Sequence, residues 1–234
     1  MLLDRQGDSV ARNGYEPPPE TKILRKTLAA ALKTKDEQGR VVASANHGVY
    51  LFYDYDGEPI YVGQTYERLS GRIRRHLTNQ RTDAVAMNVL DPFEVAEIEM
   101  WPFFELKNAD SDHAKEVLNR AEYSVYCKAI DASRHRAILN EGDVPETEPI
   151  ELPQSVRVRV VPPELFEERK HPDTRIARRA STIAALARVI SEREVSRGLR
   201  RTLLTQAKRL EYLACTRLGE ADEPTPVQEP DQEI

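Results

Sequence analysis

The sequence has little of what small disulfide-bonded or zinc-bound proteins depend on. It contains two cysteines, Cys127 and Cys215, and no CxxC motif or Cys/His cluster. This argues against a zinc ribbon or finger and against a secreted disulfide scaffold. No hydrophobic run approaches the length of a membrane span, and the start, MLLDRQGDSV, lacks the apolar stretch of a signal peptide. We therefore expect a soluble cytoplasmic protein. Its 234 residues are enough to form a buried apolar core without disulfide bonds or metal ions.

An overall excess of positive charge is also missing, since the formal net charge is −5. The basic residues are nevertheless concentrated in two stretches. Residues 67–81 hold five arginines against one acidic residue, and residues 164–217 hold thirteen Lys and Arg against seven Asp and Glu. A polyanion meets such local patches rather than the total charge. We therefore expect contacts to nucleic acid from Arg68, Arg74, Arg75, Arg178, Arg179, Arg200 and Arg201.

The chain is predicted to form one folded core with additions on both sides. Its central segment alternates strand and helix patterns, and polar stretches rich in Pro, Glu or Asp separate this segment from the ends. The expected regions are a disordered arm (1–20), an N-terminal helix with a connection (21–45), an α+β domain (46–145), a linker (146–163), a basic helical region (164–218) and a disordered acidic tail (219–234).

The α+β domain is predicted to be a small three-stranded antiparallel sheet flanked by helices. Its first two strands form a hairpin, because HGVYLFYD and PIYVGQ are rich in β-branched and aromatic residues and the Asp-Gly pair between them favours a turn. Apolar spacing predicts the remaining elements, which are a helix over 67–80, a strand over 93–101 and a helix over 112–130.

The basic region is predicted to form two helices, over 174–191 and 193–214, after a short strand in VRVRVV at 156–161. Apolar residues recur in both helices every three or four positions, which is typical of a helical hairpin or of a two-chain bundle. An arginine-rich helix is usually only a solvated face. Contact with phosphates and homodimerisation through the apolar stripes are therefore equal alternatives, and they are compatible.

Several polar side chains are spaced so that the predicted elements bring them together. Tyr50 and Tyr61 lie in neighbouring strands, eleven residues apart, where a period of two directs both to one face. Arg72 and His76 are four positions apart and share one face of a helix. Glu122 lies in the apolar stretch AEYSVY, where a carboxylate needs a partner such as a metal ion.

These motifs resemble those of the GIY-YIG nuclease family. GVY at 48–50 corresponds to the first motif and YVG at 61–63 to the second. GQT, RxxxH, a glutamate within a helix and Asn140 in ILNEG follow in the order of the family. The resemblance covers residues 46–140, and it is the combination of motifs that is specific rather than any one of them.

The resemblance implies roles for the tyrosines of the first two motifs and for the arginine and histidine of the helix. Tyr50 is similar to the tyrosine that takes the proton of the attacking water, although Tyr61 and His76 stay open as alternatives for this general base. Tyr61 would orient the water or the phosphate. Arg72 would bind the scissile phosphate.

The resemblance also implies a divalent cation, Mg²⁺ or Mn²⁺, with Glu122 as its ligand and Asn140 bracing the site through hydrogen bonds. It therefore predicts a metal-dependent endonuclease that acts on DNA, with RNA as an alternative substrate. Compact restriction-type members of the family are most similar in size, which favours a stand-alone restriction or defence enzyme by analogy.

Other functions stay open at this point. One is a repair or mobile-element nuclease of the same family. A second is a non-catalytic nucleic-acid-binding module that retains the fold, although all six motif residues are present. A third is a helical interaction protein that works through its C-terminal stripes.

Overall fold

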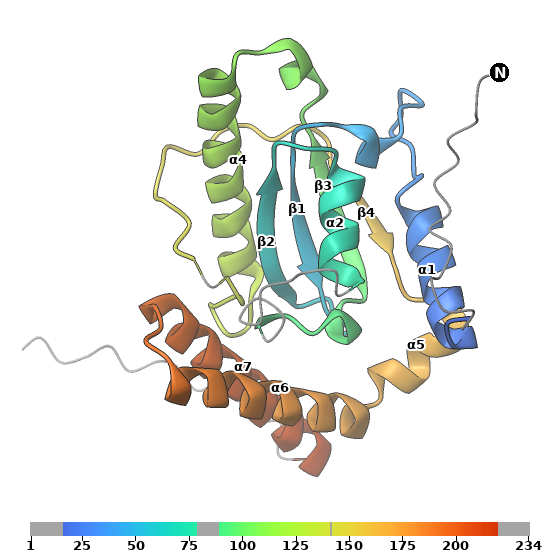
Figure 1. Ribbon diagram of the computed structural model, residues 1–234, viewed down its shortest axis with the longest axis vertical. Helices are drawn as coiled ribbons and strands as arrows, with labels where there is room; N and C mark the ends of the chain where they lie inside the picture. Colours follow the sequence, from blue (N-terminus) through green and yellow to red (C-terminus); the bar gives the residue numbers. More distant parts are fainter. Residues whose placement is uncertain (1–15, 79–88, 141, 220–234) are drawn as a thin grey trace, which may run out of the picture.

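The computed structural model describes residues 16–78, 89–140 and 142–219. Its centre is an antiparallel sheet in the order β2-β1-β3-β4, with helices packed around it (Figure 1). In this order β1 is an inner strand and β2 lies at the edge. The strands are β1 (Gly48–Tyr53), β2 (Pro59–Thr65), β3 (Glu97–Pro102) and β4 (Val156–Arg159).

Helices cover both faces of this sheet. α1 and α2 share one apolar core with the first face, and α4 packs in a second core against the other face. All six residues of β1 are buried for this reason, as expected of a short apolar run in a covered strand. The helices are α1 (Pro19–Ala31), η1 (Val42–Ser44), α2 (Leu69–Leu77), η2 (Pro92–Glu94), η3 (Phe104–Asn108), α4 (Ser111–Ala132), α5 (Pro163–Lys170), α6 (Pro172–Glu192) and α7 (Arg197–Leu218).

The predicted fold class is confirmed, but the sheet has four strands rather than three. The additional strand is β4, in the segment VRVRVV within the predicted linker. It pairs antiparallel with β3, with Val158 opposite Ile98. Val156 and Val158 pack against the first core, whereas Arg157 and Arg159 are exposed. This alternation with a period of two lets four residues complete the sheet.

The two predicted C-terminal helices are present as α6 and α7, which pack against each other as a hairpin. Ser196 caps α7 by accepting a hydrogen bond from the backbone N–H of Leu199, and Gly219 ends it with a φ of 84°. Leu186 and Leu199 join the first apolar core, and Leu213 is also buried. Much of the apolar surface of the hairpin is therefore used within the chain.

A buried ionic cluster joins this hairpin to the turn between β1 and β2. The turn residue Asp54 lies at its centre. Oδ2 of this carboxylate accepts hydrogen bonds from three guanidinium groups, those of Arg175 (3.0 Å), Arg179 (3.1 Å) and Arg209 (2.8 Å). None of the four residues is more than 3% exposed. Buried charges persist only when they are paired, so the cluster ties the helices to the turn.

The expectation that Arg179 contacts nucleic acid is wrong. Its guanidinium group donates hydrogen bonds to Asp54, to Glu94 at 2.7 Å and to the backbone oxygen of Arg209 at 2.9 Å. These partners enclose the side chain, and the residue is only 3% exposed. An excess of positive charge along a helix does not indicate which of its arginines turn inward.

Some predicted regions fall outside the described residues. These are positions 1–15 of the arm, 79–88 of the connection after α2, and 220–234 of the acidic tail. Within the three described ranges, no helix combines the length and the apolar character needed to cross a membrane.

We predict that Asp54→Asn lowers the free energy of unfolding by about 3–5 kcal/mol, because three buried guanidinium groups lose their shared counter-charge. Denaturant unfolding followed by circular dichroism measures this change. Asp131→Asn is the matched control, since Asp131 forms an exposed ion pair with Arg136 and should contribute about 1 kcal/mol or less. Equal stability of the two variants would contradict the anchoring role.

The dependence of stability on acid pH is a second test of Asp54→Asn. Burial by itself raises the pKa of Asp54, but attraction to Arg209, Arg175 and Arg179 outweighs burial, and the net pKa is lowered. The stabilisation of the fold by Asp54 is therefore complete above about pH 3.9, the ordinary pKa of aspartate. It is lost as the pH falls through the lower pKa that Asp54 has in the folded protein. Wild type and Asp54→Asn should converge in stability over that acid range.

Candidate active site

Tyr50 and Tyr61 lie side by side on one face of the hairpin. The register pairs Tyr50 with Gly63, and Phe52 with Tyr61, across the two strands. Directly opposed residues of an antiparallel pair share a face. The two tyrosine rings are stacked, with centroids 6.3 Å apart. The arrangement expected from the period of two is therefore present.

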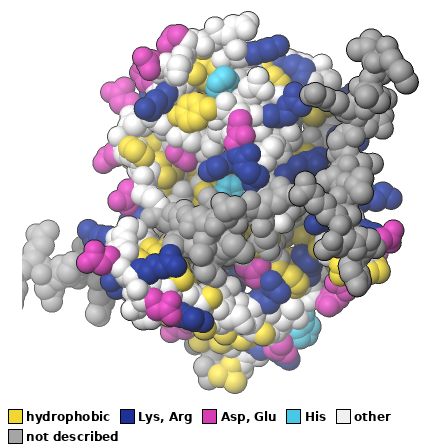
Figure 2. All heavy atoms as spheres, in the orientation of Figure 1, with side chains coloured by type: hydrophobic (Ala, Val, Ile, Leu, Met, Phe, Trp, Pro, Cys, Tyr) yellow, Lys and Arg dark blue, Asp and Glu magenta, His cyan; other side chains and the backbone are white. Residues whose placement is uncertain are grey.

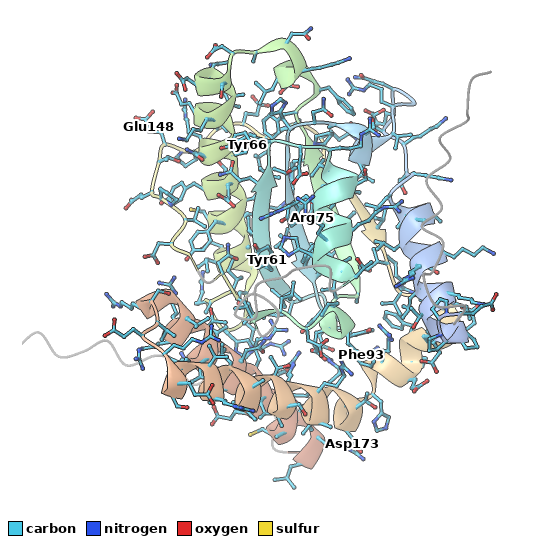
Figure 3. All side chains as sticks on the ribbon, viewed as in Figure 1. Tyr61, Tyr66, Arg75, Phe93, Glu148 and Asp173 are labelled. Atoms are coloured by element: carbon cyan, nitrogen blue, oxygen red, sulfur yellow. The ribbon has the colours of Figure 1, made fainter. Side chains whose placement is uncertain are left out.

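Helix α2 brings a histidine and an arginine to this face. Nε2 of His76 is 2.9 Å from the hydroxyl oxygen of Tyr50, and the His76 ring centroid lies 5.2 Å from that of Tyr61. Tyr50 is fully buried, and His76 is 4% exposed. Arg72, one turn earlier, is close enough to Tyr50 to influence its pKa. Figure 3 shows Tyr61 on β2 and Arg75 on α2 on the same side of the sheet.

Burial determines the acidity of Tyr50. It raises the pKa of the hydroxyl group well above its ordinary value, Tyr61 adds to the rise, and Arg72 opposes it. The hydroxyl group therefore keeps its proton near neutral pH. It donates this proton in a hydrogen bond to Nε2 of His76 when the imidazole is neutral and carries its own proton on Nδ1.

Gly63 leaves the space that the Tyr50 ring occupies. A Cβ atom at position 63 would lie 2.6 Å from Cζ of Tyr50, and closer still to its hydroxyl oxygen. The optimal separation of non-bonded carbon atoms is about 3.5–4.0 Å. The glycine of YVG is therefore required by the tyrosine of GVY on the neighbouring strand.

Glu122 reaches the same region from the other side of the sheet. α4 packs against the face opposite α2, beside the edge strand β2. Oε2 of Glu122 accepts a hydrogen bond from Nε2 of Gln64 at 3.0 Å. Gln64 lies opposite Val49, on the face turned away from the tyrosines. The polar residues therefore meet around the edge of the sheet rather than on one face.

The carboxyl group of Glu122 has an unusual acidity. Burial raises its pKa to about 7, while the hydrogen bond from Gln64 and the charge of Arg72 act in the opposite direction. A partly buried carboxyl group of this kind gains stability as an anion when a cation lies next to it.

The donor atoms around Glu122 fit a hard divalent cation. Glu122 offers carboxylate oxygens, and Oε1 of Gln64 is buried without a hydrogen-bond partner among the residues that the structure describes. Mg²⁺ takes oxygen ligands, commonly one or two protein carboxylates, and keeps several waters. Over the described ranges, no three or more His, Cys, Asp or Glu side chains gather into a possible metal site. A metal ion at this place would therefore have one carboxylate ligand from the described residues, that of Glu122.

Asn140 contacts the backbone of the edge strand rather than the tyrosines. Its Oδ1 atom accepts a hydrogen bond from the N–H of Val62 at 3.1 Å, and its Nδ2 atom donates to the carbonyl oxygen of Val62 at 2.9 Å. The N–H of Leu139 donates to the carbonyl oxygen of Ile60 at 2.7 Å. Asn140 therefore sits where it can hold β2 in place.

Six other arginines expected to contact nucleic acid lie at the surface, and three of them pair with an acidic neighbour. Figure 2 shows basic side chains gathered on the face that α2 forms. Exposed ion pairs contribute little to stability, so a phosphate can replace the acid. Contact of this group with nucleic acid remains a prediction. The pairs are Arg75–Glu67, Arg178–Asp91 and Arg201–Asp143, and the other three arginines are Arg68, Arg74 and Arg200.

Sequence reasoning missed the contact between Gln64 and Glu122. In the sequence, GQT stands out only as part of the family pattern. With a period of two, Gln64 points away from the tyrosine face. Nothing near residue 64 indicates that the helix carrying Glu122 covers that other face.

Two stacked tyrosines, a buried histidine, an arginine and a carboxylate therefore meet around the edge of a small sheet. Residues 46–109 match the family model described as the GIY-YIG catalytic domain. The chain therefore carries a nuclease domain of the GIY-YIG superfamily, and the resemblance inferred from its motifs is confirmed.

The matched segment includes Tyr50, Tyr61, Arg72 and His76, and it ends before Glu122. The structure brings Glu122 into this group independently of the match. No curated protein and no solved structure is significantly similar to this chain.

We predict that Gly63→Ala lowers the rate of phosphodiester cleavage by about 100-fold, because the Tyr50 ring must move and a displacement of about 1 Å has an effect of this size. Single-turnover cleavage measures the rate. Gly71→Ala is the matched control, since a Cβ atom at this position of α2 meets nothing within 4 Å. Equal rates for the two variants would show that the close approach has no catalytic consequence.

Proposed function

We propose that this chain is a metal-dependent endonuclease that hydrolyses phosphodiester bonds in DNA. The observation that carries the proposal is the meeting of the Tyr50–His76 hydrogen bond, Arg72 and Glu122 around one edge of the sheet. Hydrolysis of a phosphodiester needs a proton acceptor for water and positive charge for the developing phosphorane, and these groups supply both.

In this proposal the buried Tyr50–His76 pair handles the proton of the attacking water. Tyr50 retains its own proton because of burial, so it becomes a base only as it passes that proton to His76. The 2.9 Å separation of the two groups supports this transfer. Tyr61, stacked on Tyr50, orients the water or the phosphate, and Arg72 holds the scissile phosphate through its guanidinium group.

Glu122 is proposed to hold one Mg²⁺ or Mn²⁺ ion. When bound, such an ion stabilises the charge on the transferring phosphate and the leaving oxygen. The placement of Glu122 beside Arg72, and its buried position, support this role. Asn140 keeps β2, and with it Tyr61, in position through its two hydrogen bonds to Val62.

The surface arginines are proposed to bind the DNA backbone. Arg68, Arg74 and Arg75 lie at or next to α2, close to the proposed scissile phosphate, and Arg178, Arg200 and Arg201 lie on the C-terminal hairpin. Contacts of this kind position a duplex and add salt-dependent affinity without reading sequence.

The biological role that we propose is a stand-alone, cytoplasmic restriction or defence nuclease. The close packing of α1 and the C-terminal hairpin on the nuclease core supports a compact enzyme with added helices. We also propose a homodimer with one active site for each DNA strand, for which Leu204 of α7, 56% exposed, is an available apolar contact.

We predict that Tyr50→Phe and Glu122→Ala each reduce cleavage by about 100-fold or more, because one removes the transferable proton and the other the metal ligand. The assay offers plasmid, single-stranded DNA and RNA with Mg²⁺, Mn²⁺ or EDTA. Glu116→Ala, an exposed glutamate on the same helix as Glu122, and Tyr212→Phe are the matched controls, and both should cut like wild type.

The substrate that is cut and the pattern of cuts distinguish a restriction role from a repair role. Cleavage of duplex DNA at fixed sites fits a restriction role, whereas cutting at branched or damaged structures fits repair. If wild type binds DNA but cuts none of the substrates with either metal, the enzyme reading is contradicted, and a non-catalytic binding module is the better description.

A further inference from the structure

Gln64 makes two hydrogen bonds to α4, although the proposed function gives it no role. Its Nε2 atom donates one hydrogen bond to Oδ1 of Asn119 at 2.8 Å and another to Oε2 of Glu122 at 3.0 Å. Asn119 and Glu122 are three positions apart on α4, so they lie on one face of that helix. Gln64 therefore connects the edge strand to the face of α4 that carries the proposed metal ligand.

These two contacts determine the orientation of the amide. Both neighbours of Nε2 are oxygen atoms, and Glu122 in its carboxylate form can only accept, so the NH₂ group of Gln64 faces them in that form. The carbonyl oxygen Oε1 consequently points away from both hydrogen bonds. It is buried, and no described residue supplies it with a hydrogen bond.

A buried carbonyl oxygen without a partner is unfavourable, because burial removes its hydrogen bonds to water and nothing replaces them. Oε1 therefore needs a partner that binds an oxygen lone pair, next to a carboxylate that needs a positive charge. A divalent cation meets both requirements at once. One carboxylate and one neutral carbonyl oxygen are ligands of the kind that Mg²⁺ and Mn²⁺ prefer, with water and phosphate oxygens for the remaining positions.

We propose that Gln64 is the second protein ligand of the divalent cation, binding it through Oε1 while its NH₂ group fixes Glu122 and Asn119. The inference rests on the proposed metal-dependent nuclease function. It makes Asn119 a positioning residue that acts through Gln64. It also explains why the residue after the glycine of YVG belongs to the active site although it lies on the opposite face from the tyrosines.

Direct binding of Mn²⁺ by the full-length protein tests the proposal. Free Mn²⁺ is measured by electron paramagnetic resonance during titration of wild type, Gln64→Leu, Gln64→Glu and Gln154→Leu with MnCl₂. Gln154→Leu is the matched control, because Gln154 also donates a hydrogen bond from Nε2 to a carboxylate, that of Glu37, but at the surface. Thermal unfolding verifies that each variant is folded, and cleavage of DNA is recorded in parallel.

Gln64→Leu should weaken Mn²⁺ binding by about 10-fold or more, the range found when groups around a metal are removed. Gln64→Glu should bind Mn²⁺ at least as tightly as wild type, because its carboxylate keeps an oxygen ligand. If Gln64 only holds Glu122 through its NH₂ group, Gln64→Glu should fail as badly as Gln64→Leu, since a carboxylate cannot donate and repels Glu122.

The possible failures are distinguishable. Wild type that binds Mn²⁺ and cuts DNA, with unchanged Mn²⁺ affinity in Gln64→Leu, overturns the ligand role of Gln64 and leaves the nuclease function standing. Equal loss of affinity in Gln64→Leu and Gln64→Glu also overturns it, in favour of a purely positioning role. Wild type that neither binds Mn²⁺ nor cuts DNA overturns both proposals.

Discussion

Asp54, in the turn between β1 and β2, accepts hydrogen bonds through both of its carboxylate oxygens. Oδ1 receives the backbone N–H groups of Asp56 and Glu58 at 2.9 and 3.1 Å. Oδ2 receives the three guanidinium groups of α6 and α7. One carboxylate therefore shapes the hairpin turn and anchors the C-terminal helices. Because the turn sets the register of β1 against β2, it also sets which residues face each other in the site.

The arrangement of the side chains in the candidate site depends on this register. A shift of one residue would turn Tyr61 to the α4 side and take Gly63 away from the Tyr50 ring, which needs a residue without a side chain there. Asn140 holds the free edge of β2 at Val62, and Gln64, two residues further on, reaches α4. Groups from both faces of the sheet thus meet at its edge.

Local spacing carries much of this arrangement, and so the sequence could predict it. The period of two in the hairpin places Tyr50 and Tyr61 on one face, and the four-residue separation on α2 places Arg72 beside His76. Contacts between distant segments are different. Gln64 meets Glu122 only because α4 covers the second face, and no local pattern specifies that packing.

The orientation of the arginines could not be predicted from the sequence either. Arg178 and Arg179 are adjacent in sequence, yet one pairs with Asp91 at the surface and the other is enclosed with Asp54 and Glu94. The helical period separates the two positions by about 100°, but which of them faces inward depends on where the acidic partners lie in the folded chain. The alternation of valine and arginine in VRVRVV predicts the strand β4, but it does not predict that this strand pairs with β3.

The position of the metal ion is the most direct test of the proposed active site. Crystals grown with MnCl₂ give an anomalous difference map in which Mn²⁺ is identified without assumptions about the site. We expect the strongest peak to lie beside the carboxylate of Glu122, on the side of Arg72 and the tyrosine pair. Mn²⁺ bound only elsewhere, at a concentration that supports DNA cleavage, would contradict the assignment of this edge of the sheet as the active site.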